Sequence, residues 1–210
     1  MGQAWYYNDA DASDGREPHQ YTPNRPVSLD QLAQVGVLHW TIDVTKPGYL
    51  ETVDRISQER SYKNRDEITI SKEALPNYDE KLKVFFTEHI HEDEEIRFIL
   101  EGSGYFDIRS PGDRWIRIAC DAGDMIILVR LDLWFSGMRS KHVDLVLQPA
   151  GMYHRFTLDA KNYLKAMRLF KEDPKWTPLN RSSETDVNPY RKDYLSSFAQ
   201  PAAALFVGEL

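Results

Sequence analysis

The stretch EHIHEDEEIRFILEGSGYFDIR, residues 88–109, decides the fold, because it opens a succession of short β-rich runs separated by turn residues. EIRFIL is followed by GSG, YFDIR by SPGD and WIRIA by DAGD, and the runs MIIL, RFTL and YLKAMRLF come later in the chain. Strands of this length with Gly- and Asp-containing turns between them are typical of a β-sandwich or a small barrel. We therefore expect a mainly β fold, with turns at GSG, SPGD and DAGD.

The residues before this stretch predict a few helices that flank the strands. Ser28 can cap a short helix in SLDQLAQVG (28–36), where the final glycine would end it. Apolar residues at helical spacing predict further helices near residues 50–60 and over 78–86. Between the first two helices, VLHWTIDV (37–44) alternates well enough to predict a strand.

The two ends of the chain look less regular. Residues 1–27 are expected to form an irregular N-terminal arm, since Asp, Pro, Asn and Gly dominate from residue 7 onward. Residues 180–210 are expected to form a C-terminal tail with one short helix around YRKDYLSSFAQ. A chain of 210 residues suffices for a single domain with a sizeable core, so we expect one domain over residues 1–210.

Charge and composition limit the classes of partner that we expect the protein to bind. The chain has 26 Lys and Arg against 33 Asp and Glu, a net charge of −7, which argues against a nucleic-acid surface. No apolar run is long enough to span a bilayer, and the polar, acidic start lacks the features of a secretory signal. Cys120 is the only cysteine and cannot form an internal disulfide. We expect a cytoplasmic protein without a membrane partner, with the nucleus as a second location; nothing demands more than a monomer.

The His-x-His pair at the start of the opening stretch is the strongest indication of a functional site in the sequence. In an extended segment His89 and His91 point to the same side, Glu95 follows beyond a bend, and His154 in PAGMYHRF can join them from another strand. Two or three imidazoles with one carboxylate suit iron(II), nickel or manganese in O2 or Lewis-acid chemistry. On spacing alone, however, a His-x-His pair in an acidic stretch is more often a solvated strand edge.

The surrounding residues favour the metal site through a family resemblance. HIHEDEEIRFILEG (89–102) resembles the first cupin motif, and GDMIIL with PAGMYH resembles the second. Lys83 stands where the first motif has a glycine, and the second motif lacks its closing Asn. Within the cupins, LPNYDEKLKVFFTEHIHEDEEIRFILEGSGYFDIR, PAGMYHRFTLD, YLKAMRLF and WTPLNR resemble the acireductone dioxygenases of methionine salvage, over about residues 3–199.

This resemblance implies a cupin-type double-stranded β-helix, or jelly-roll barrel, and a dioxygenase activity. It implies that one Fe(2+) or Ni(2+) ion per monomer is held by His89, His91, Glu95 and His154. The implied substrates are O2 and 1,2-dihydroxy-3-keto-5-methylthiopentene, an enediol that binds as a dianion. The iron form of the family gives 2-keto-4-methylthiobutanoate and formate, and the nickel form gives methylthiopropanoate, formate and carbon monoxide.

The resemblance also implies roles for five other residues. Arg97 and Arg168 match arginines of the family's site, where a guanidinium can neutralise and orient the enediolate. Phe85, Phe156 and Trp176 match aromatic residues that wall the family's pocket. The structural alternatives are ion pairs for the two arginines, with Asp93 or Glu94 in the case of Arg97, and ordinary core packing for the aromatic residues.

One segment breaks the family pattern. VRLDLWFSGMRSKHVDLVLQ (129–148) separates GDMIIL from PAGMYH, and deleting its twenty residues restores the five-residue spacing between Gly123 and Pro149. Val codons begin with GT and a Gln codon can be CAG, the letters at the two ends of an intron, so we expect a translated intron. The alternative is a genuine loop, since insertions cost only about 0.6 kcal/mol per doubling of loop length.

Two other functions stay open from the sequence. A different cupin oxygenase or isomerase would keep the metal and change the substrate. A binding protein without catalytic activity would result if residues 129–148 are present and displace the strand that carries His154.

Overall fold

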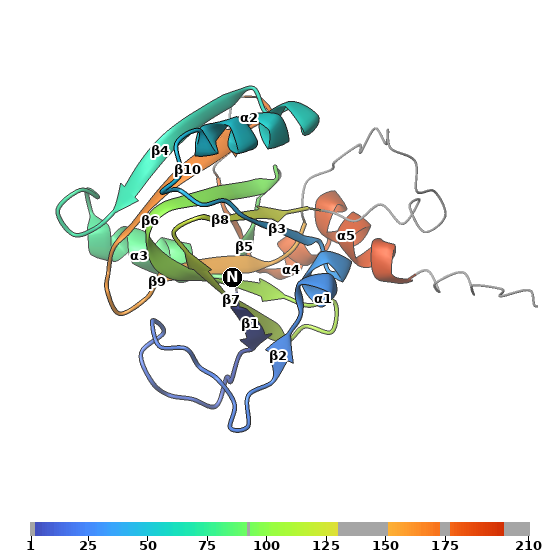
Figure 1. Ribbon diagram of the computed structural model, residues 1–210. Helices are drawn as coiled ribbons and strands as arrows, with labels where there is room; N and C mark the ends of the chain where they lie inside the picture. The colour runs from blue at the N-terminus through green and yellow to red at the C-terminus, as the bar shows by residue number, and fades with distance from the viewer. Residues whose placement is uncertain (1–2, 92, 130–150, 173–176, 200–210) are drawn as a thin grey trace, which may run out of the picture.

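Antiparallel strands make up most of the fold in the computed structural model, which describes residues 3–91, 93–129, 151–172 and 177–199. Within these described residues, eleven strands join in one sheet system. They are β1 (Gln3–Tyr6), β2 (Pro26–Val27), β3 (Val37–Thr41), β4 (Asn64–Ile70), β5 (His89–Ile90), β6 (Glu95–Arg109), β7 (Trp115–Asp121), β8 (Asp124–Leu128), β9 (His154–Leu158), β10 (Leu164–Phe170) and β11 (Leu179–Asn180). The expectation of a mainly β fold is confirmed (Figure 1).

The predicted turn at GSG is wrong, because β6 runs without reversal through Gly102, Ser103 and Gly104. Before these residues β6 pairs with β8 and β10, and after them it pairs with β7 and β9. Gly102 has a φ of +74°, and a Cβ there would lie 2.1 Å from the carbonyl oxygen of Tyr163. The glycine therefore bends the strand from one set of partners to the other, where local sequence suggested a hairpin.

Two apolar clusters hold the fold together. One fills the interior with residues such as Ile99, Phe106 and Ile118. The other lies on the opposite face of β6 and β8, where Ile96 and Ile127 pack with Val53 and Ile56 of α2 (Tyr49–Glu59). Figure 1 shows α2 lying along β4 and β10. Strand β8 is thus covered on both faces, which explains its apolar run MIIL.

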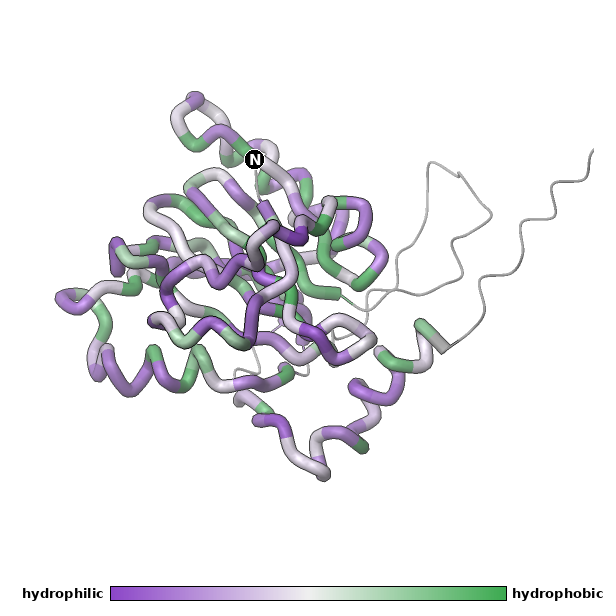
Figure 2. The backbone as a smooth tube through the Cα atoms, turned by 90° about the horizontal axis from the view of Figure 1, so that it is seen from below, coloured by the Kyte–Doolittle hydropathy of each residue, from purple (hydrophilic) through white to green (hydrophobic). Residues whose placement is uncertain are grey.

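The predicted helices are present. Ser28 caps α1 (Leu29–Gln34) by accepting from the amide of Gln31, and the Gln31 side chain accepts from the amide of Ser28 in return. The helices expected near 50–60 and over 78–86 are α2 and α3 (Tyr78–Phe86). Figure 2 shows mainly hydrophilic stretches on the longer helices and hydrophobic stretches along central strands, as expected of helices that cover a sheet with one face.

The N-terminal arm is more ordered than predicted. Residues 1–27 contain β1 and β2. β1 pairs with β7 over four residues, and Ala4 and Trp5 are buried by it. A four-residue strand gives too short a pattern for its sequence to reveal, and it is stabilised by β7, far away in the chain.

The C-terminal region holds two helices where one was expected, α4 (Ser183–Asp186) and α5 (Pro189–Ala199). Strand β4 was not predicted at all. Among the described residues, no helix is both long and apolar enough to cross a membrane.

Candidate metal centre

Three histidines from two separate stretches of chain meet inside the sheet system. His89 on β5 lies directly opposite His154 on β9, with ring centroids 4.6 Å apart. His91 lies just beyond β5, and its ring centroid is 4.8 Å from that of His89 and 5.4 Å from that of His154. One nitrogen from each ring lies within 4.8 Å of the other two. The predicted proximity of these residues is therefore observed, while their role as ligands stays a prediction.

Backbone carbonyls orient two of these rings. His89 Nδ1 lies 2.6 Å from the carbonyl oxygen of Thr87, and His154 Nδ1 lies 3.0 Å from that of Met152. A carbonyl can only accept, so each Nδ1 carries the hydrogen and each Nε2 keeps a lone pair. The Nε2 of His154 is buried and has no hydrogen-bond partner in the described part of the chain. This is the arrangement of a ligating histidine, whose second nitrogen is held by a backbone acceptor.

The protonation states of His89 and His154 suit the binding of a cation. Burial lowers the pKa of His89 and takes the pKa of His154 well below its usual value, and neighbouring histidines lower both further. Both rings are therefore neutral near pH 7, and their lone pairs are not occupied by protons. The donor set suits a divalent metal, because three imidazoles bring one nitrogen each within 4.8 Å of the other two.

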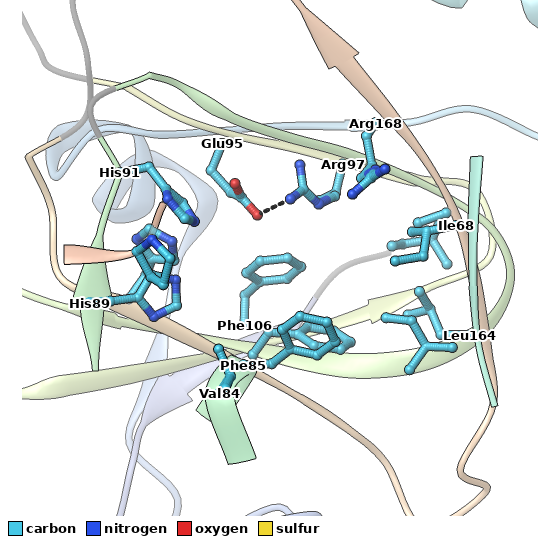
Figure 3. Close-up of a pocket in the computed structure, with 16 residues that line it drawn as sticks. Ile68, Val84, Phe85, His89, His91, Glu95, Arg97, Phe106, Leu164 and Arg168 are labelled. Carbon is cyan, nitrogen blue, oxygen red and sulfur yellow. Dashed lines mark ion pairs between the residues drawn. The ribbon is translucent and has the colours of Figure 1, made fainter. Parts of the chain in front are cut away.

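Glu95, the first residue of β6, lines the same pocket as the three histidines. Its side chain is buried, and its Oε1 atom lies 2.6 Å from Nη2 of Arg97. The Nη1 atom of Arg97 also donates to the carbonyl oxygen of Ile96 at 2.8 Å. Figure 3 shows the carboxylate of Glu95 turned toward Arg97, beside the histidines. Glu95 is therefore close to the histidine cluster, but the compact group of nitrogen donors does not include its oxygens.

Glu94, the neighbour of Glu95, points the other way and is anchored at both oxygens. Tyr62 donates a 2.7 Å hydrogen bond to one oxygen, and Lys171 lies 3.0 Å from the other. The Glu94 side chain is only 3% exposed. Burial, followed by the nearby carboxylate, raises the pKa of Tyr62, so its hydroxyl stays a donor. These contacts fix the backbone immediately before Glu95.

Arg168 lies beside Arg97 on the pocket wall. It is directly opposite Arg97 on β6 and directly opposite Asp66 on β4. Its Nε atom donates to Asp66 Oδ1 at 2.7 Å and its Nη2 atom to Asp66 Oδ2 at 2.5 Å. The structural alternative expected for Arg168, an ion pair, is therefore present at a residue that also lines the pocket.

A pocket of about 190 Å³ is lined by the histidines at one end and by apolar side chains at the other (Figure 3). Phe85 and Phe156 both line it, with ring centroids 6.4 Å apart, and Phe106 packs against Phe156 at 5.0 Å. Trp176, the third aromatic residue expected here, lies outside the described residues.

The sequence did not reveal the wall formed by β4. Ile68 and Ile70 of this strand line the pocket, and they face Ala166 and Leu164 of β10 across the sheet. Two β-branched residues separated by one position in EITI were the available signal. The segment was missed because charged residues occupy its first half.

The sequence as a whole matches the ARD/ARD′ family over residues 3–143 and 130–178. The chain belongs to this family. It is 50% identical over 184 residues to acireductone dioxygenase from Rattus norvegicus, covering 88% of this chain and 91% of that protein. It is 47% identical over 202 residues to acireductone dioxygenase from Homo sapiens, covering 96% of this chain and all of that protein.

A solved structure supports the fold of this family member. The acireductone dioxygenase from Bacillus anthracis, with a cadmium ion in its active centre, superposes with a TM-score of 0.61. It is 23% identical and covers 85% of this chain and 98% of its own. The expected cupin fold is thus confirmed, and the relatives that are 47% and 50% identical confirm the expected dioxygenase class.

Proposed function

We propose that this chain is an acireductone dioxygenase that holds one Fe(2+) or Ni(2+) ion on His89, His91, Glu95 and His154. Its substrate is 1,2-dihydroxy-3-keto-5-methylthiopentene, which it cleaves with O2. The observation that carries the proposal is the buried Nε2 of His154, which has no partner in the described structure and lies in a cluster with two more imidazoles. A buried nitrogen without a partner costs free energy that a bound cation would recover.

The metal, when bound, supplies a Lewis acid that lowers the pKa of the enediol and orients it for reaction with O2. Arg97 supplies the positive charge next to this point. Its guanidinium is held by Glu95 and by the carbonyl of Ile96, so it can donate to an enediolate oxygen with a fixed geometry.

The rest of the pocket binds the tail of the substrate and excludes water. Phe85 and Phe156 line the pocket together with apolar residues of β4 and β10, where they can cover a methylthio group. Removing water from this site strengthens the attraction between the Arg97 guanidinium and the developing enediolate.

Activity with the synthetic enediol tests this proposal. Protein loaded separately with iron and nickel under anaerobic conditions should consume the enediol once O2 is admitted. Iron-loaded protein should release 2-keto-4-methylthiobutanoate and formate, and nickel-loaded protein methylthiopropanoate, formate and carbon monoxide. Protein that holds stoichiometric metal but leaves the enediol intact would instead be another cupin oxygenase or isomerase. Protein that retains no iron, nickel, cobalt or manganese would be a binding protein.

We also propose that residues 129–148 are translated intron sequence. The two pieces of the family match end and begin inside this segment, at residues 143 and 130. Residues 130–148 lie outside the described structure. The source of such a segment is a gene-model error or a retained intron, and sequencing the transcript across this point tests the first, because a mature message that retains all of the corresponding bases would rule out a gene-model error. A monomeric state and a location in the cytoplasm or nucleus belong to the same proposal, and gel filtration and cell fractionation test them.

A further inference from the structure

The charges along the pocket wall form a row. Across β6, β10 and β4 the order is Arg97, Arg168 and Asp66, each directly opposite the next in the strand register. Two like charges opposite one another in a sheet are unfavourable. Asp66 removes this cost by forming two hydrogen bonds with the Arg168 guanidinium.

The row ends where the apolar wall begins. Two residues along from Asp66 and Arg168 lie Ile68 and Ala166, and two further along lie Ile70 and Leu164. All four of these apolar residues line the pocket, as does Arg168. Figure 3 shows Arg168 beside Arg97, with Ile68 and Leu164 at the end of the pocket away from His89 and His91. Arg168 is therefore the charged side chain nearest to the wall that would contact the tail of a substrate.

We infer that Asp66 is a specificity-determining residue, which cancels the charge of Arg168 so that the pocket selects acireductones with an uncharged tail. The inference rests on the proposed function, because it concerns the substrate of that same site. A guanidinium without its carboxylate at this position would attract an anionic tail and make the apolar wall a poorer site for a neutral one. Paired with Asp66, the Arg168 guanidinium adds no net charge to the described part of the tail end of the pocket.

The chain offers a matched control on the same two strands. Glu67 pairs with Lys165 at 2.8 Å, which is also an ion pair between β4 and β10. Neither of these residues lines the pocket, since side chains alternate between the faces of a strand. Glu67→Gln therefore removes an ion pair between these strands without changing the charge of the pocket wall.

The experiment compares two synthetic acireductones, one with the methylthio tail and one with a terminal carboxylate on a tail of matched length. For each variant it measures kcat/KM with both compounds, their Kd values in the absence of O2, and the metal content. Asp66→Asn should shift the ratio of the two kcat/KM values toward the anionic tail by about fivefold, the size of an ion pair at a partly exposed site. Arg168→Gln should shift it by a similar factor in the opposite direction. The double variant and Glu67→Gln should both keep the wild-type ratio.

The outcomes distinguish a failure of the proposed function from a failure of the inference about Asp66. A wild-type protein that holds metal but consumes neither compound contradicts the proposed function. An active wild type whose ratio is unchanged in both Asp66→Asn and Arg168→Gln overturns the inference and leaves the function standing. If Asp66→Asn does not fold, the opposite shift in Arg168→Gln decides. Higher salt should shrink both shifts, because these side chains are partly open to solvent.

Discussion

The inner and outer faces of the sheet bury polar groups in two different ways. On the outer face, Arg117 and Asp107 are both buried, and Arg117 donates to both Asp107 oxygens and to the carbonyls of Gly15 and Glu17. On the inner face, His154 is buried too, but its Nε2 has no partner in the described structure. A buried pair such as Arg117 and Asp107, whose nitrogen and oxygen atoms all have partners, leaves no polar group uncompensated, whereas a buried acceptor without a partner is a cost that a ligand can recover. The contrast distinguishes a structural pair from a binding site.

The largest expected effect comes from removing one histidine of the inner cluster. His91→Ala should reduce the metal content and the dioxygenase activity to background, because two imidazoles and one carboxylate hold the ion far less tightly. His91 is only partly buried, so the metal-free variant should unfold at nearly the same temperature as metal-free wild type. Elemental analysis and calorimetry check this. A variant with full metal content would show that the proposed ligand set is wrong.

The next effect tests the outer face. Asp107→Ala should destabilise the protein by about 3–5 kcal/mol, since it leaves the buried Arg117 guanidinium without its carboxylate. Urea unfolding measures the loss. The folded fraction should still bind one metal ion per chain, because Asp107 is on the face of β6 away from the histidines. Stability equal to wild type, or a loss of metal from the folded fraction, would remove the distinction between the two faces.

A smaller effect is expected at Arg97, which lies next to the cluster. Arg97→Lys keeps a positive charge but loses the planar arrangement of donors, so kcat/KM should fall by about tenfold to a hundredfold. The metal content should not change, since the guanidinium is not a ligand. Steady-state kinetics with the enediol, together with elemental analysis, measure both. Unchanged kcat/KM would reduce Arg97 to an ordinary ion-pair partner of Glu95.

The smallest effect concerns an ion pair that is exposed. Arg55 and Glu59 form an ion pair on α2 with both side chains open to solvent. Arg55→Gln should change the free energy of unfolding by at most about 0.5 kcal/mol. Urea unfolding of this variant, compared with that of Asp107→Ala, would show that the burial of an ion pair, and not the number of ion pairs, determines how much free energy of unfolding is lost. A loss of several kcal/mol would contradict this.

The sequence predicted the parts of the site that depend on local spacing. His89 and His91 share a side because they are two residues apart in extended chain, and the motif that contains His154 indicated its partner strand. The sequence did not show that Glu95 pairs with Arg97, because Asp93 and Glu94 were the expected ion-pair partners and Glu95 was expected as a metal ligand. Whether Glu94 or Glu95 faces Arg97 depends on the direction of each side chain, and the direction of Glu94 is fixed by its contacts with Tyr62 and Lys171.

Contacts between distant segments also explain the errors in the fold. Glycines at 102 and 104 are typical of a hairpin turn, yet the close approach of Tyr163 requires a glycine inside a continuous strand. Strand β4 is half charged because Asp66 and Glu67 pair with residues of β10, some hundred positions later in the chain. Such pairings become visible only when the strands are side by side.

X-ray absorption at the nickel edge of the nickel-loaded protein tests the central claim most directly, because imidazole rings scatter in a recognisable pattern. We expect one nickel ion per chain, a first shell of nitrogen and oxygen only, and outer-shell scattering from three imidazoles. A first shell with one imidazole or none would contradict this expectation and would mean that the histidine cluster is not the metal centre.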